Sequence, residues 1–213
     1  MIEPIYYGQT AAIIGTGPSL TQEQLDKVKH LKKFGANRAF EFDLDVLHGC
    51  NHQFWHYYWH KVKDLRCDKW TTRPELTYPG LNYIREEWIP GLSKDPTYIA
   101  AHHGTGPQLI NIAYHYGIKR MLLIGWDMKF SPDYNGKAQQ IGAKPRHYFG
   151  EYPKELQHWP SVKVKDGVLT GLIEEMETIK PEDYGIEIIN CTPDSAMTCF
   201  PMMTLDEALI GYS

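Results

Sequence analysis

The sequence predicts an α/β protein with a mainly parallel sheet, helices on both faces of that sheet and one irregular segment. Short apolar runs that end in glycine or a polar turn alternate with longer stretches of helical periodicity, which is typical of a parallel sheet covered by helices. Several of these runs are apolar throughout rather than alternating, as expected of strands that are buried on both faces.

The same alternation places the individual elements along the chain. The predicted strands cover residues 10–15, 33–40, 53–58, 97–101, 120–126 and 185–191, and the predicted helices cover residues 20–31, 107–116, 168–179 and 205–210. Pro107 suits the first turn of a helix and Gly117 suits its end, so the second helix has the clearest boundaries.

Length and composition favour one domain, residues 1–213. A chain of 213 residues can bury roughly 70% of its unfolded surface, so it needs no disulfide or metal to hold a fold. With 42% hydrophobic and 23% charged residues, the composition excludes collagen, coiled-coil and disordered proteins. The net charge of -4 gives no general attraction to nucleic acid or to anionic lipid, so we expect no nucleic-acid partner.

The sequence also bears on targeting segments and on the redox state of the cysteines. The N-terminus lacks a basic patch followed by an apolar run, and no stretch reaches the roughly 18 apolar residues of a membrane span. We therefore expect a cytoplasmic location and no membrane span. The four cysteines form no C-x-x-C pair, so we expect them to be reduced and mostly structural.

Residues 129–160 break the alternation of strands and helices. They are rich in Pro, Gly, Lys, Tyr and His and carry little periodicity. A stretch of this length inside a compact domain is usually a functional lid or a disordered loop. We expect a lid-like segment here, with simple surface decoration as the alternative.

Two glycine-containing loops follow predicted strands and precede predicted helices. The first loop runs Gly15, Thr16, Gly17, Pro18, Ser19, and the second includes His102, Thr105 and Gly106. Such loops let a ligand approach the backbone, and the free amides of a helix start favour an anion. The third glycine of a dinucleotide fingerprint and the Lys-Ser/Thr pair of a Walker motif are both missing. A nucleotide crevice is the functional hypothesis, and a tight structural turn is the alternative.

Five segments carry short motifs in a fixed order: 15–20, 34–37, 105–127, 147–150 and 189–195. They include Gly-Thr-Gly-Pro-Ser-Leu, the segment Phe-Gly-Ala-Asn that ends in Asn37, the run Gly-Ile-Lys-Arg-Met-Leu-Leu-Ile-Gly-Trp-Asp, and His-Tyr-Phe-Gly. This series resembles the bacterial CMP-sialic-acid-dependent sialyltransferases, a glycosyltransferase family with a Rossmann-like core. It also resembles related Gly-Pro-Ser-Leu proteins of unknown function.

The resemblance implies an enzyme that transfers a CMP-activated sugar of sialic-acid type, with inversion, to a glycan or other hydroxyl acceptor. It implies His147 as general base, Tyr134 and Lys129 as groups that stabilise the leaving phosphate, and no metal or other cofactor. The nucleotide contacts it implies are Gly15, Thr16, Gly17, Pro18, Ser19, Asn37, His56, His102, Thr105, Gly106 and Asp127. Related transferases often form tetramers, so assembly into a homo-oligomer is open.

The chain departs from the family pattern at several of these positions. Thr16 replaces an Asn of the first loop, His56 stands where another Asn is expected, and His102 replaces an Arg. Lys129 falls near one of two family tyrosines, and Tyr134 approximates the second. The given sequence is also shorter than typical members, and we expect it to differ from them in having no C-terminal membrane-associating extension.

Two groups of residues are candidate metal sites. Asp127 ends a predicted strand and could hold a divalent ion, but it has no Asp-x-Asp partner. His52, His56 and His60 are spaced four apart, which puts them on one face of a helix or of a strand. Because no Cys or Glu stands nearby in motif spacing, we expect no zinc there. We expect instead that His56 faces the nucleotide from a strand, with Trp55 and Phe54 packed beneath it.

Two other functions stay open from the sequence. One is a non-catalytic module, of viral or other origin, that binds a nucleotide or sugar nucleotide. In such a module the fold persists without sugar transfer. The other is pyrophosphate transfer to a pterin alcohol, because archaeal enzymes of that kind resemble the same Gly-Pro-Ser-Leu core. That reaction needs Mg²⁺ to bridge the phosphates of ATP.

Overall fold

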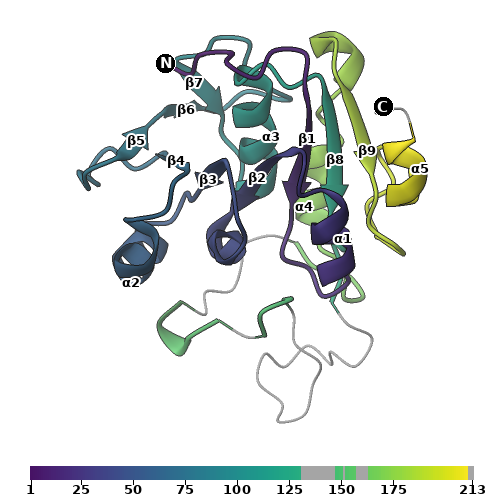
Figure 1. Ribbon diagram of the computed structural model, residues 1–213, viewed down its shortest axis with the longest axis horizontal. Coiled ribbons are helices and arrows are strands. Elements are labelled where there is room, and N and C mark those ends of the chain that lie inside the picture. Colours follow the sequence, from purple (N-terminus) through teal and green to yellow (C-terminus); the bar gives the residue numbers. More distant parts are fainter. Residues whose placement is uncertain (131–146, 151, 157–162, 211–213) are drawn as a thin grey trace.

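Figure 1 shows the computed structural model, which describes residues 1–130, 147–150, 152–156 and 163–210. Seven strands form one sheet in the order β5-β4-β3-β2-β1-β8-β9, and all its pairings are parallel. The strands are β1 (Thr10–Ile14), β2 (Lys32–Ala36), β3 (Val46–His48), β4 (Asp68–Thr71), β5 (Leu81–Tyr83), β8 (Arg120–Ile124) and β9 (Glu187–Asn190). The predicted parallel α/β fold is confirmed.

Helices cover both faces of this sheet because its central strands are apolar on both sides. Ala11 and Ile13 of β1 face one core, and Ala12 and Ile14 face the other. The helices are α1 (Gln22–Lys27), α2 (His52–Val62), α3 (Thr105–His115), α4 (Thr170–Met176) and α5 (Leu205–Leu209). Single 3-10 turns are η1 (Asn37–Glu41), η2 (Lys154–Leu156) and η3 (Pro181–Tyr184).

A second, two-stranded sheet covers the outer side of α3. It pairs β6 (Arg85–Glu87) with β7 (Tyr98–Ala100) in parallel. Helix α3 packs against β2 on one side and against β7 on the other, as Figure 1 shows. This arrangement explains why α3 is buried nearly all round, since a helix covered on both sides has little face left for water.

The predicted strand at 53–58 is wrong, because these residues belong to α2. The aromatic residues suggested a strand by their β propensity, but their burial follows helical spacing. Phe54, Trp55 and Tyr58 are buried, whereas His56 is exposed. The expectation that His56 lies on a strand is therefore also wrong.

Other differences concern length. The strand predicted over 33–40 ends at Ala36, because Asn37 adopts a left-handed φ of 52° and starts a 3-10 turn. Strands β3 to β6 have only three or four residues each, too short for a periodicity to be seen, and none of them was predicted. The strand predicted at 97–101 exists as β7, but in the smaller sheet.

Most of the predicted lid-like segment, Tyr134 included, lies outside the described residues. The part that is described begins with Lys129, which forms a bridge with Val168, and resumes at His147. All four cysteines are free thiols. Across the described ranges, none of the helices combines the length and the apolar character that crossing a membrane requires.

Candidate functional site

The parallel strands β1, β2, β3 and β8 all end at the same edge of the sheet. The chain runs from β1 outward through β2 and β3, and later returns to place β8 on the other side of β1. Ligands of open α/β sheets bind at such a switch point, beyond the carboxyl ends of the strands. The loops that follow these strands contain most of the predicted site residues.

The first loop packs directly onto the end of β8. The amides of Gly15 and Gly17 donate to the carbonyls of Ile124 and Gly125, at 2.8 and 2.9 Å. A Cβ atom on Gly17 would overlap the Asp127 carboxylate, and one on Gly15 would overlap the Gly125 carbonyl. These two glycines are therefore required by close approach within the protein, which is the structural reason offered by the tight-turn alternative.

Asp127 closes this contact. Its carboxylate accepts hydrogen bonds from the Ser19 amide at 3.2 Å and from the Ser19 hydroxyl at 2.8 Å. Burial raises the pKa of Asp127 above its usual value, while the bonds from Ser19 and the nearby Lys129 ammonium act in the opposite direction. The amides of residues 15, 17 and 19 thus have partners inside the protein, and a carboxylate already lies at this loop.

His147 reaches the same loop from 131 residues further along the chain. Its Nδ1 atom lies 3.4 Å from the Thr16 hydroxyl, and the Tyr148 amide donates to the Thr16 carbonyl at 2.9 Å. Arg38, in η1 after β2, holds the neighbouring segment: its guanidinium lies 4.7 Å from the Phe149 ring centroid and donates to the Phe149 carbonyl. The histidine is thereby placed between the ends of β1 and β2.

A second group of polar side chains lies at the start of α3. The Asn37 amide nitrogen lies 3.4 Å from the Thr105 hydroxyl, to which it donates, and Cys50 Sγ lies 3.2 Å from the same hydroxyl. Gly106 packs against the Trp126 ring, where a Cβ atom would lie 2.8 Å from the indole. Predicted site residues that follow β2 and β7 therefore meet at the N-terminus of α3, together with Trp126, which follows β8 and was not predicted as a site residue.

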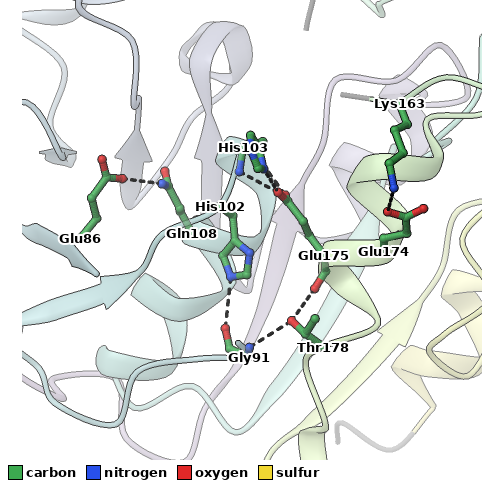
Figure 2. A network of polar contacts seen from close by, with 10 residues as sticks. Glu86, Gly91, His102, His103, Gln108, Lys163, Glu174, Glu175 and Thr178 are labelled. Carbon is green, nitrogen blue, oxygen red and sulfur yellow. Dashed lines mark hydrogen bonds and ion pairs between the residues drawn. The ribbon is translucent and has the colours of Figure 1, made fainter. Parts of the chain in front are cut away.

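Sequence reasoning missed a buried polar chain beside this group. His48 Nε2 lies 2.9 Å from Gln108 Oε1, and the Gln108 amide donates to Glu86 at 2.9 Å, which Figure 2 shows. Arg73 donates to the Cys50 carbonyl at 2.6 Å and lies 4.0 Å from Glu86. Burial lowers the pKa of His48. These residues come from short strands and α3, so no local motif could have identified them.

Two predicted residues lie elsewhere. His56 is exposed on α2, where its Nδ1 lies 2.6 Å from the Tyr78 hydroxyl and its ring contacts His52. His102 lines a cavity on the other side of the α3 start, with Nε2 3.2 Å from the Gly91 carbonyl. Among the residues that the structure describes, no three His, Cys, Asp or Glu side chains come together as a metal site would require.

Comparison with known proteins adds one likeness in fold. No protein-family model matches the chain, and no curated protein matches it significantly. A similar solved structure is the MAf glycosyltransferase from Magnetospirillum magneticum AMB-1, with a TM-score of 0.57 and 12% identity. The fold is Rossmann-like. The match covers 92% of this chain but 34% of the other, so the chain spans about a third of that glycosyltransferase.

Proposed function

We propose that the protein is glycosyltransferase-like and binds a nucleotide sugar at the carboxyl ends of β1, β2 and β8. The observation that carries this proposal is the meeting of His147 with Thr16, 3.4 Å apart, at the switch point of the sheet. An imidazole titrates near neutral pH and suits proton removal from a sugar hydroxyl. The likeness in fold to a glycosyltransferase supports the same reading.

The finer proposal is a CMP-activated sugar of sialic-acid type as donor. In this reaction the acceptor oxygen forms a bond to the anomeric carbon from the face opposite the phosphate, which inverts that centre. The bond to the CMP phosphate breaks with its electron pair going to the phosphate oxygen, and the acceptor proton moves to the His147 imidazole. Asn37 and Thr105 would then hold the nucleotide, and the Lys129 ammonium would offset the charge of the leaving phosphate.

Nucleotide titration tests the donor first. Isothermal titration of the full chain with CMP, CDP, UDP and GDP should show the tightest binding for CMP. Asn37→Ala should weaken CMP binding about tenfold, a loss of about 1.4 kcal/mol. Equal affinity for all four nucleotides, or no effect at Asn37, would remove the donor assignment.

Replacing the proposed base tests the catalytic step. His147→Ala should lower sugar transfer from CMP-sialic acid at least about 100-fold, as expected for loss of a general base, and leave the CMP affinity nearly unchanged. His60→Ala, an exposed histidine on α2, is the matched control and should keep full activity. If His147→Ala loses CMP binding together with transfer, its role is structural instead.

A second candidate, a non-catalytic module that binds a nucleotide or sugar nucleotide, is favoured by one specific observation. The amides of Gly15, Gly17 and Ser19 already donate within the protein, and the Asp127 carboxylate faces Ser19. A donor phosphate would therefore find fewer free N–H groups at this loop than at an open phosphate-binding turn. CMP binding without any release of CMP from CMP-sialic acid would favour this candidate.

A further inference from the structure

A cavity of about 570 Å³ lies beside the start of α3, outside the group formed by Thr16, Asn37 and His147. It is lined by residues 88–90, residues 101–103, Lys163 and the α4 region from Gly171 to Thr178. Its volume falls within the range of roughly 300–1,000 Å³ that is usual for small-molecule sites. The donor site proposed at the ends of β1, β2 and β8 does not include this cavity, and His102 is its one lining residue that the sequence predicted as a nucleotide contact.

One side of the cavity is apolar. Trp88, Ile89, Pro90 and Ala101 line it, and the Trp88 side chain is unusual in being 73% exposed to solvent. The indole ring lies at 5.3 Å from the His103 ring, tilted by 58°, so one edge is supported while much of the ring stays open. An open indole beside a cavity offers a flat surface for the C–H face of a ring-shaped ligand.

The cavity is also lined by two carboxylates whose charges already have partners, as Figure 2 shows. Glu174 binds Lys163 at 2.9 Å. Glu175 accepts bonds from the amides of His103 and Gly104, at 2.8 and 3.3 Å, and contacts the His103 ring at 2.7 Å. Those amides immediately precede the first residue of α3, so Glu175 lies near the end of the helix where the dipole stabilises an anion. The cavity therefore favours a neutral polar ligand over an ionic one.

His102 supplies a hydrogen-bond acceptor. Its Nε2 lies 3.2 Å from the Gly91 carbonyl, which can only accept, so this nitrogen carries the proton. Burial lowers the pKa of His102, which favours the neutral ring, and the Nδ1 atom then keeps its lone pair. Figure 2 shows the ring between Gly91 and Glu175, with its other nitrogen turned away from the Gly91 carbonyl.

We propose that this cavity binds a neutral sugar ring, with its C–H face on Trp88 and one hydroxyl donating to His102 Nδ1. A sugar combines an apolar ring face with several hydroxyl donors and no charge, which matches the three features just described. An anionic ligand would be repelled by Glu174 and Glu175. A cation that paired with either carboxylate would have to displace Lys163 from Glu174, or the amides of His103 and Gly104 from Glu175.

The position of the cavity makes this sugar the acceptor of the proposed transfer. Residues 102 and 103 line the cavity, while Thr105 and Gly106, two and three residues after His103, contact Asn37 and Trp126. The backbone of Lys129, a residue of the candidate site, forms an antiparallel β-bridge with Val168, which precedes α4 in the chain. The acceptor role rests on the proposed function, whereas sugar binding itself does not.

Ligand-observed saturation-transfer NMR on the full chain tests the site without any donor. Methyl β-lactoside, methyl β-galactoside and N-acetylglucosamine serve as probes, with sorbitol as an open-chain polyol control. We expect saturable binding of at least one probe and none of sorbitol. Cytidine should not displace the bound sugar, since the nucleoside is assigned to the other site.

Variants locate the binding. Trp88→Ala should weaken the bound probe about tenfold. His102→Gln can keep a donor to the Gly91 carbonyl while it removes the Nδ1 acceptor, and should also weaken binding about tenfold. Tyr57→Ala and His60→Ala, exposed on α2 outside the cavity, are matched controls and should bind like the unmodified protein.

The inference is overturned if no probe binds saturably, if cytidine or sorbitol competes, or if Trp88→Ala and His102→Gln bind normally while their thermal midpoints are unchanged. Should either variant fail to fold, paramagnetic broadening of the Trp88 indole by a spin-labelled galactoside gives the same decision on the unmodified protein. Sugar binding without CMP binding would refute the proposed donor and leave the cavity assignment intact. CMP binding without sugar binding would do the reverse.

Discussion

The two glycine-containing loops look alike in sequence, yet the structure uses them differently. The loop after β1 closes on β8, with its glycines against Gly125 and its Ser19 against Asp127. The loop after β7 also has its amides bonded, to Glu175, but it borders an open cavity. The comparison teaches that a Gly-x-Gly turn indicates close approach of another part of the chain. In the first loop that part is backbone and a carboxylate, and in the second it is the side chains of Leu172 and Trp126.

The largest expected effect comes from filling the space at the closed loop. In Gly17→Ala the new Cβ would overlap the Asp127 carboxylate and lie 2.7 Å from the Gly125 carbonyl, a backbone atom that cannot turn aside. We expect a loss of about 3 kcal/mol in the free energy of unfolding, measured by urea denaturation.

Gly104→Ala is the matched variant in the open loop. There the Cβ would lie 2.6 Å from Leu172 Cδ2, the end of a flexible side chain, so the expected loss is about 1 kcal/mol or less. Equal losses in the two variants would mean that the closed and open loops do not differ in how tightly they are packed.

A smaller effect is expected at the carboxylate that anchors the open loop. Glu175→Gln replaces one acceptor oxygen by an NH₂ group facing the amides of His103 and Gly104. It should cost about 1–2 kcal/mol of unfolding free energy. Glu174→Gln, which affects only the exposed pair with Lys163, should cost about 0–1 kcal/mol. An equal cost at both positions would show that the bonds from the His103 and Gly104 amides to Glu175 do not stabilise the start of α3.

The smallest effect is a change in pH dependence at Asp127. Its pKa is raised in the folded protein, so the folded state binds the proton more tightly than the unfolded state. The stabilisation this brings is full below the unfolded pKa, near 3.8, and is lost as the pH rises through the folded pKa. Asp127→Asn should therefore flatten a fall in unfolding free energy that starts just above that pH. An unchanged pH profile in parallel urea titrations would contradict this sign.

Sequence reasoning located the long, uniformly buried elements and missed the four short strands β3 to β6. Strands β1 and β8 and helix α3 were predicted because their apolar runs and their Gly and Pro boundaries are local signals. Helix α2 was mistaken for a strand because aromatic residues favour strands, and only the burial of Phe54, Trp55 and Tyr58 reveals the helical period.

The structure brings several of the predicted site residues together, and their role stays a prediction. Thr16 and Thr105 were proposed from glycine-containing loops, whereas Asn37 and Asp127 were implied by the family resemblance. Parallel topology brings the ends of β1, β2 and β8 to one edge, and Asn37 also contacts Thr105. The contact of His147 with Thr16 joins residues 131 positions apart, and no spacing rule predicts such a pair. The same holds for the buried chain from His48 through Gln108 to Glu86, whose members lie on β3, α3 and β6.

Helix α3 has a consequence for anyone who redesigns this protein. Eight of its eleven residues are buried, since a sheet lies on each side of it. Such a helix offers almost no position where a substitution is free of packing cost. Altered ligand preference should therefore be sought by varying residues 88–90 and the exposed side of α4, while the sequence of α3 is left unchanged.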